Sequence, residues 1–286
     1  MSTMLKWAGN KTGIMSELMA HLPTSGQRLV EPFAGSCAVM MATDFPAYLV
    51  ADINPDLINL YRQVKENCES FVKYAREFFV SSNDETAYYI ARQDFNSSAE
   101  MNNLWRAIYF LYLNRFGYRG MCRYNLQGMF NVPYGHYKEP YFPESEIRAF
   151  ADKAQRATFI CASYEESLAM VKAGDVVYCD PPYDGTFTKY HTAGFAQGDQ
   201  HQLACILVEL ASSGCSVIVS NSDTALARSL YRSFTIHTIT AKRSIGVAAG
   251  EGKTASEIIA VSIPPQPLWV GVDFASDRDF SAEVPV

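Results

Sequence analysis

The sequence predicts an α/β fold built on a mostly parallel sheet, with a mostly helical module inserted into it. Two observations lead to this expectation. Short apolar segments typical of buried strands recur along the chain, and helical patterns separate most of them. This alternation stops between about residues 55 and 155, where no buried strand is indicated. Alternating strands and helices are typical of a parallel sheet covered by helices, and the interruption indicates an insertion.

The expected elements can be placed along the chain. Strands are expected near 28–33, 48–52, 157–161, 175–179, 216–220, 234–238 and 257–262. Helices between them are expected near 11–21, 36–43, 198–213 and 223–231. Within the interruption, helices are expected near 56–79, 85–95 and 101–114, the last with an apolar face of Leu104, Ile108 and Leu111. We therefore expect a core domain of residues 1–54 and 146–264, an inserted module of residues 55–145 and an acidic tail of residues 265–286.

Composition excludes several classes of protein. Apolar residues make up 48% of the chain and charged residues 19%, which indicates a packed core. No apolar run approaches the roughly 18 residues of a membrane span, and residues 1–25 do not resemble a signal peptide. The seven scattered cysteines include no C-x-x-C, and the five histidines show no H-x-x-x-H spacing. We expect reduced thiols, no metal site and no membrane partner.

Charge is distributed unevenly along the chain. The net charge is −6, which by itself argues mildly against a nucleic-acid partner. Residues 101–138, however, contain no Asp or Glu and carry five basic side chains. Arginines interleaved with tyrosines suit contacts to phosphates and base edges, although a loop of this composition can also be a solvated surface.

The stretch DVVYCDPPYDG (175–185) holds the most informative motif. An apolar strand ends at Cys179 and is followed directly by Asp180, Pro181, Pro182 and Tyr183. In open α/β sheets, ligands bind beyond the carboxyl ends of the strands. The Asp180 carboxylate and the Pro181 carbonyl can accept the two hydrogens of an exocyclic amino group, and the tyrosine ring can stack on the base that carries it.

With this motif the chain resembles the amino-group DNA methyltransferases, and in particular the Dam-type adenine methyltransferases of the D12 class. Asp-Pro-Pro-Tyr resembles their motif IV, LVEPFAGSCAV (29–39) their motif I, and LKWAGNK (5–11) their N-terminal motif. ADIN (51–54), NRFGYRGMCRYN (114–125), FNVPYG (130–135), EPYFPE (139–144) and SNSDT (220–224) also match. The resemblance covers about residues 4–264 in the same order and implies a Rossmann-like S-adenosylmethionine-dependent methyltransferase fold.

The resemblance also implies a cofactor site. It assigns Trp7, Lys11, Phe33, Gly35, Asp52, Ser163, Tyr164 and Asp180 to S-adenosylmethionine. Asp52 suits this role in its own right, because an acid at the end of a second strand can accept hydrogen bonds from ribose hydroxyls. Two residues depart from the family pattern. Cys37 stands where a second glycine is usual, and Ala162 replaces an acidic residue. Glycine lets the backbone approach a ligand closely, so Cys37 bears on cofactor affinity.

A DNA-binding set follows in the same way. Arg123 matches a guanine-reading arginine, Tyr118 matches an aromatic wedge, and Lys6 matches a lysine that contacts bases or phosphates. The remaining members of the set are Arg115, Arg119, Met121, Asn125, Pro133 and His136. Two of them depart from the pattern: Arg119 replaces an asparagine and His136 replaces an arginine.

The resemblance implies a DNA adenine-N6 methyltransferase that flips its target base and acts at GATC. The core domain would bind the cofactor and catalyse the transfer, and the inserted module would recognise the target. We expect a monomer in solution that binds double-stranded DNA, with several copies on one DNA, in the cytoplasm of a bacterium or of a host cell. Transfer to cytosine N4, to RNA, to a protein amide or at another DNA sequence stays open, as does a catalytically silent DNA-binding protein. Cytosine-C5 chemistry is disfavoured because no Pro-Cys pair occurs.

Overall fold

A computed structural model describes residues 2–97, 101–183, 195–242 and 254–264. In these ranges seven strands form one sheet in the order β3-β2-β1-β4-β5-β7-β6. Neighbouring strands are parallel except for β7, which runs antiparallel to β5 and β6. The strands are β1 (Arg28–Glu31), β2 (Tyr48–Asp52), β3 (Ala157–Cys161), β4 (Asp175–Cys179), β5 (Ser216–Ser222), β6 (Thr235–Lys242) and β7 (Thr254–Ser262). All lie where the sequence places them, so the predicted α/β class is confirmed.

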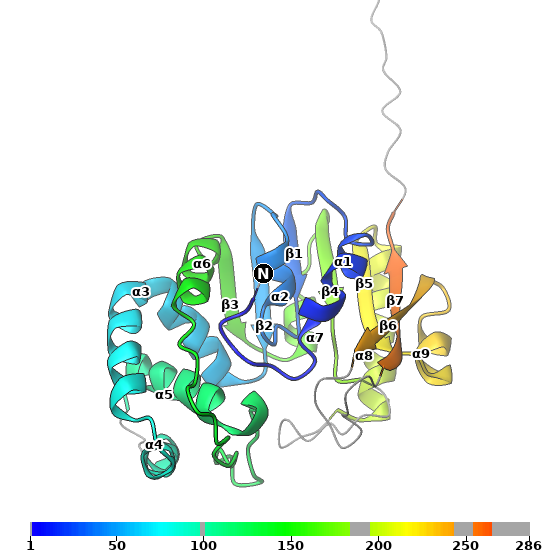
Figure 1. Ribbon diagram of the computed structural model, residues 1–286. Helices are drawn as coiled ribbons and strands as arrows, with labels where there is room; N and C mark the ends of the chain where they lie inside the picture. The colour runs from blue at the N-terminus through cyan, green and yellow to red at the C-terminus, as the bar shows by residue number, and fades with distance from the viewer. Residues whose placement is uncertain (1, 98–100, 184–194, 243–253, 265–286) are drawn as a thin grey trace, which may run out of the picture.

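Helices surround this sheet (Figure 1). The described residues before α3 and after β3 contain η1 (Lys11–Ile14), α1 (Met15–Met19), α2 (Ala38–Ala42), α7 (Tyr164–Leu168), α8 (Gln197–Ser212) and α9 (Ala225–Leu230). The interruption contains α3 (Pro55–Ser81), α4 (Glu85–Ser97), α5 (Asn103–Phe116), η2 (Tyr118–Gly120) and α6 (Glu144–Ala154).

The sequence analysis did not predict α6 and α7. In α6 the apolar positions Ile147, Phe150, Ala151 and Ala154 have helical spacing, so a usable signal was overlooked. Helix α7 has only five residues, too few to show a period. Its signal is a capping box at Ser163 and Glu166. The expected boundary between residues 145 and 146 falls inside α6.

The two faces of the sheet carry separate layers of apolar side chains. Leu29 and Val176 belong to the hydrophobic cluster that includes residues of α2, α3, α5 and α6. Their neighbours Val30 and Val177 belong to the cluster that includes residues of α7, α8 and α9. Successive strand residues point to opposite faces, so the apolar pairs Leu29–Val30 in β1 and Val176–Val177 in β4 are buried on both sides of the sheet.

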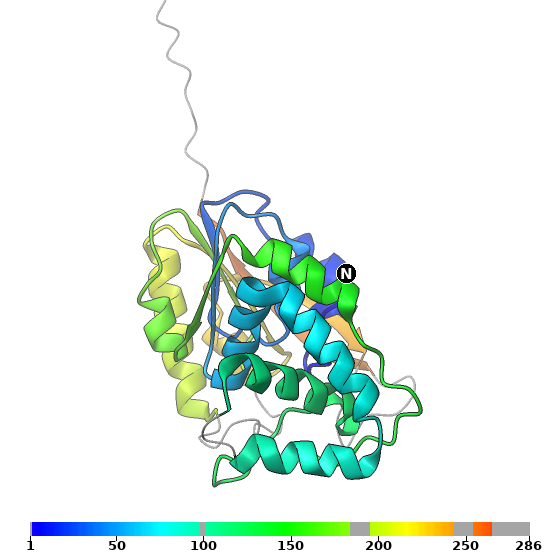
Figure 2. The same ribbon diagram turned by 90° about the vertical axis from the view of Figure 1, so that its left-hand side faces the viewer.

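Helices α3 to α6 gather beside the β3 edge of the sheet, and Figure 2 looks onto them. Helix α3 begins at Pro55, where the Asn54 side chain accepts hydrogen bonds from the first free backbone amides. Aromatic pairs hold the layer together, for example Phe78 stacked on Tyr109 with ring centroids 4.6 Å apart. The start of α3 therefore lies three residues beyond the end of β2, close to Asp52.

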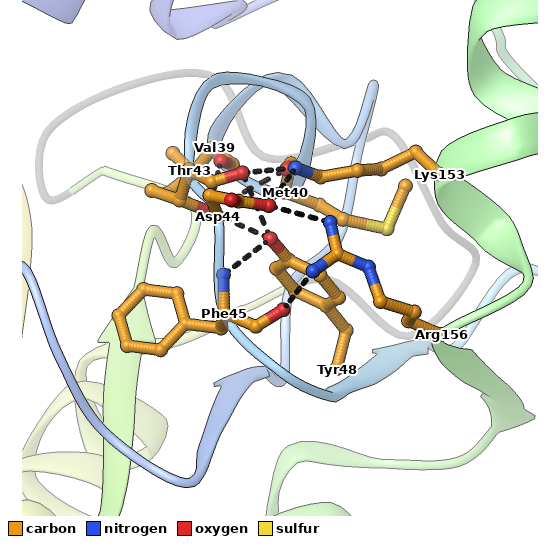
Figure 3. A network of polar contacts seen from close by, with 8 residues as sticks. All are labelled: Val39, Met40, Thr43, Asp44, Phe45, Tyr48, Lys153 and Arg156. Atoms are coloured by element: carbon orange, nitrogen blue, oxygen red, sulfur yellow. Dashed lines mark hydrogen bonds and ion pairs between the residues drawn. The ribbon is translucent and has the colours of Figure 1, made fainter.

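A polar network ties α6 to the loop between α2 and β2 (Figure 3). The buried Tyr48 hydroxyl donates to the Thr43 carbonyl at 2.8 Å, and the Lys153 ammonium donates to the same carbonyl. Arg156 donates to the Phe45 carbonyl at 2.8 Å and to the exposed Asp44 carboxylate at 2.6 Å. Exposed ion pairs contribute little, so the buried hydrogen bonds carry most of the stabilisation. This network lies at the amino end of β2, which leaves the carboxyl end free for ligands.

Candidate active site and nucleic-acid interface

Asp180 follows β4, which is buried along its whole length. The Lys11 ammonium lies 2.8 Å from the Asp180 carboxylate and also donates to the Gly9 carbonyl at 2.9 Å. The side chains of Lys11 and Asp180 are 8% and 19% exposed. Burial raises the pKa of Asp180, and the Lys11 charge opposes that rise. The structure thus brings together two predicted site residues that are far apart in the sequence.

Tyr183 lies in the same cluster. Its hydroxyl donates to Glu257 on β7 at 2.8 Å, and the Lys11 ammonium lies 4.7 Å from its ring centroid. Burial raises the pKa of Tyr183 well above its ordinary value, and the negative charges of Asp180 and Glu257 add to the rise. The tyrosine therefore stays a neutral hydrogen-bond donor whose ring direction is set by its hydroxyl contact.

The two prolines are supported from the neighbouring strand and helix. Gln200 on α8 donates to the Pro182 carbonyl at 2.7 Å, and Asn221 on β5 donates to the Gln200 side-chain oxygen at 3.1 Å. Both amide side chains are buried. Asn221 belongs to the matched SNSDT stretch, and its place explains that match. Gln200 and Glu257 were missed, because a single Gln in a helix or Glu in a strand carries no recognisable signal.

The predicted cofactor residues surround the carboxyl ends of β1 and β2. Asp52 accepts hydrogen bonds from the backbone amides of Gly35 at 3.1 Å and Asn54 at 3.0 Å. Gly35 has φ +47°, and a Cβ built on it would lie 2.9 Å from the Trp7 indole nitrogen. Glycine is therefore required where Trp7 covers the loop after β1. Next to it, Cys37 is fully buried with φ 56°, so it adopts the left-handed conformation that the replaced glycine would favour.

Three aromatic rings lie beside this loop. Phe33 stacks on Tyr164 with ring centroids 5.7 Å apart, and Phe195 lies edge-on to Phe33 at 5.8 Å. Ser163 is the N-cap of α7, and its hydroxyl accepts from the Glu166 amide. Phe195 was not predicted; it lies at the end of a stretch whose other residues fall outside those described.

A charged residue of motif I is buried at the same place. Glu31 ends β1 and is 2% exposed. Burial raises the pKa of its carboxyl to about 8, a hydrogen bond with the Met40 backbone opposes the rise, and Asp180 adds to it. The sequence analysis assigned Glu31 no role.

The Gly-, Tyr- and Arg-rich stretch folds into an irregular hairpin of residues 117–135. Antiparallel bridges join Gly117 to Tyr134 and Tyr124 to Phe130. At its tip the Asn125 side chain accepts from the backbone amides of Gln127 and Met129. Asn125 thus shapes the turn of this 117–135 hairpin.

The predicted DNA-binding residues differ in exposure. Tyr118, Arg119, Pro133 and His136 are exposed, whereas Lys6, Met121, Arg123 and Asn125 are half-buried. Arg115 is buried, with its guanidinium 5.2 Å from the Tyr141 ring centroid, and burial lowers its pKa. The Arg123 guanidinium donates to the Asn131 side chain at 2.8 Å and to the Asn131 carbonyl at 3.1 Å. Arg119 and His136, the two departures from the family pattern, both have positive φ, 55° and 52°.

Asn114 joins this hairpin to the N-terminal motif. Its side chain accepts from the Lys6 amide at 2.9 Å and donates to the carbonyls of Lys6 at 2.7 Å and Gly120 at 2.9 Å. Gly120 has φ +65° and packs so closely that a Cβ there would lie 2.1 Å from the Lys6 Cβ. Lys6 and Lys11 belong to one short motif, so this motif contacts both the hairpin, through Lys6, and Asp180, through Lys11.

Within the part of the chain that the structure describes, no group of three or more His, Cys, Asp and Glu side chains is placed to hold a metal ion. In the same residues no helix is long and apolar enough to span a membrane. Residues 184–194 and 243–253 lie outside the described ranges, and so does the expected acidic tail of residues 265–286.

Comparison with known proteins agrees with the resemblance. Residues 7–245 match the family described as D12 class N6 adenine-specific DNA methyltransferase. The chain is 66% identical to the retron Ec67 DNA adenine methylase of Escherichia coli, over 99% of this chain and 98% of that protein. It is 46% identical to a DNA adenine methylase of Salmonella typhi and 45% identical to one of Vibrio cholerae, in each case over 91% of this chain and 95% of the relative. The chain therefore belongs to the D12 class of N6 adenine-specific DNA methyltransferases.

Proposed function

We propose that this enzyme transfers a methyl group from S-adenosylmethionine to N6 of a flipped adenine in GATC of double-stranded DNA. The observation that carries the proposal is the Asp180 cluster at the carboxyl end of β4, where Lys11, Asp180 and Tyr183 meet. The N-terminal motif that supplies Lys11 also contacts the loop after β1, through Trp7 and Gly35, and the 117–135 hairpin, through Lys6 and Gly120. Residues 1–54 and 146–264 would carry catalysis, and residues 55–145 would recognise the target.

The residues after β1 and β2 fit S-adenosylmethionine. The Asp52 carboxylate suits ribose hydroxyls, and the rings of Phe33 and Tyr164 offer a surface for a purine. When bound, this cofactor supplies an activated methyl group. The family resemblance assigns the same residues, Asp52, Phe33 and Tyr164, to this cofactor.

Within this proposal, the chain positions and activates the adenine amino group. Its lone pair is delocalised into the ring, so the free amino group is a poor nucleophile. Hydrogen bonds from N6 to the Asp180 carboxylate and the Pro181 carbonyl favour a pyramidal, more nucleophilic nitrogen. The ring of Tyr183 stacks on the base, and Gln200 holds the adjoining turn through the Pro182 carbonyl. Asp180 need not be a strong base, because the methylated N6 loses its proton readily.

The 117–135 hairpin is proposed to read the DNA. The exposed ring of Tyr118 suits insertion into the base stack, and Arg123 suits the two acceptors of a guanine. The relatives are named DNA adenine methylases, which supports adenine as the target. We propose that the enzyme acts as a monomer, with several copies on one DNA.

Methyl transfer from labelled S-adenosylmethionine to two duplexes tests this function. One duplex contains a single GATC, and in the other its adenine is replaced. We expect transfer only to the first duplex, none with Asp180→Ala, and cofactor binding retained by that variant. Transfer to both duplexes, or full activity of Asp180→Ala, would contradict the proposal. Transfer to neither duplex by wild-type protein that binds the cofactor would point to a different target sequence.

A further inference from the structure

Asp56, at the start of α3, is a buried carboxylate outside the Asp180 cluster. It is 4% exposed. One carboxylate oxygen accepts from the Arg106 guanidinium of α5 at 2.6 Å, and the other accepts from the Tyr124 hydroxyl at 2.7 Å. A buried charge is tolerated only where such partners satisfy it. Asp56 therefore joins α3 and α5 to the 117–135 hairpin.

Hydrogen bonds also connect Asp56 to β2, the cofactor strand, which ends at the proposed cofactor residue Asp52. The Asn54 side chain accepts from the Asp56 amide at 3.0 Å, and the Asn54 amide donates to Asp52 at 3.0 Å. Asp52 in turn accepts from Gly35 at 3.1 Å. Each link spans only a few residues of chain or one short contact, so Asp56 has little freedom relative to β2.

On its other side, Asp56 contacts the hairpin beside Arg123. Tyr124 follows Arg123 directly and pairs with Phe130 across the hairpin. Burial, and after it the negative charge of Asp56, raise the pKa of Tyr124 well above its ordinary value, so its hydroxyl remains a donor to Asp56. The Arg123 side chain is already aligned by Asn131 on the opposite strand.

We propose that Asp56, acting through Tyr124, is a positioning residue that sets the hairpin relative to the cofactor strand and thereby determines sequence discrimination. This inference rests on the proposed function. A bidentate contact to guanine needs the guanidinium in one place and one orientation. Loss of the Tyr124 hydroxyl frees the hairpin near its tip, so Arg123 contacts guanine less selectively while the Asp180 cluster is unchanged.

Tyr124→Phe tests this, since it removes a single oxygen and keeps the ring. Tyr112→Phe is the matched control: its buried hydroxyl, on α5, donates to the Ser82 carbonyl at 2.5 Å, away from the hairpin tip. For each variant, kcat/KM is measured by single-turnover transfer on a GATC duplex and on one whose guanine is replaced by adenine. Urea unfolding shows whether each variant is folded under assay conditions.

We expect Tyr124→Phe to reduce the ratio of the two kcat/KM values about tenfold, the loss of one good base contact, and Tyr112→Phe to leave it within about twofold. Unchanged discrimination in Tyr124→Phe overturns the inference, and so does an equal loss in Tyr112→Phe, which would indicate general loosening. If the wild-type enzyme does not separate the two duplexes, the proposed GATC specificity fails instead.

Discussion

The Tyr183 hydroxyl donates a 2.8 Å hydrogen bond to Glu257, which lies on the antiparallel strand β7. The negative charge of Glu257 also raises the pKa of Asp180. A residue outside every matched motif thus acts on both ends of the Asp-Pro-Pro-Tyr turn. Since the proposed chemistry uses an ionised Asp180, Glu257 bears on the pH range of the enzyme.

Glu257→Gln should extend activity to lower pH. Glutamine can still accept the Tyr183 hydrogen bond, but it removes a charge that raises the pKa of Asp180, so Asp180 stays ionised in more acidic solution. The acid limb of the kcat/KM profile, measured by single-turnover transfer from pH 5 to 8, is expected to move to lower pH. Glu209→Gln, an exposed change on α8, serves as control. If the acid limb of the Glu257→Gln profile stays at the wild-type pH, the Glu257 charge does not affect the ionisation of Asp180 in the active enzyme.

Lys11→Met should move the acid limb of the kcat/KM profile to higher pH. The Lys11 charge holds the pKa of Asp180 down, so its loss lets burial raise that pKa further. Activity at pH 7 is expected to fall and to recover partly as the pH rises. Lys73→Met, an exposed change on α3, provides the comparison. An equal loss at every pH would mean that Lys11 acts only through contacts to ligands.

Glu31→Gln should reduce the loss of unfolding free energy that occurs as the pH becomes alkaline. The folded-state pKa of about 8 exceeds the ordinary value of 4.5. The folded state therefore binds the proton more tightly, and this stabilisation, complete below about pH 4.5, is lost as the pH rises to about 8. Urea unfolding at pH 6 and pH 9 should show a smaller difference in the variant than in the wild type. Equal differences would mean that Glu31 is not protonated in the folded protein.

Two substitutions of Cys37 should separate backbone strain from side-chain burial. Both Cys37→Ala and Cys37→Gly remove the buried sulfur, but only glycine adopts φ 56° without strain. We expect the glycine variant to be more stable than the alanine variant by roughly 0.5–1 kcal/mol in urea unfolding. If alanine is equally stable, the left-handed conformation at Cys37 costs nothing.

Much of the fold could be predicted, because burial on both faces gives the central strands adjacent apolar residues, such as Leu29–Val30 and Val176–Val177. The place of Asp52 at the end of β2 could be predicted from the apolar residues before it, whereas Gly35 was singled out by its match to motif I, and the cofactor role of both stays a prediction. The burial of Arg115 could not, since its sequence neighbours resemble those of the exposed Arg119. Helix α6 was missed although its apolar spacing was readable.

The sequence by itself determined which residues can do chemistry and where the strands that carry them end. Only the tertiary structure decided their partners: Lys11 with Asp180, Tyr183 with Glu257, and Tyr124 with Asp56. The physical reason is that side-chain type and strand periodicity are local properties. These contacts depend instead on the strand order β3-β2-β1-β4-β5-β7-β6 and on how α3 and α5 pack beside it, which bring distant parts of the chain to one edge of the sheet.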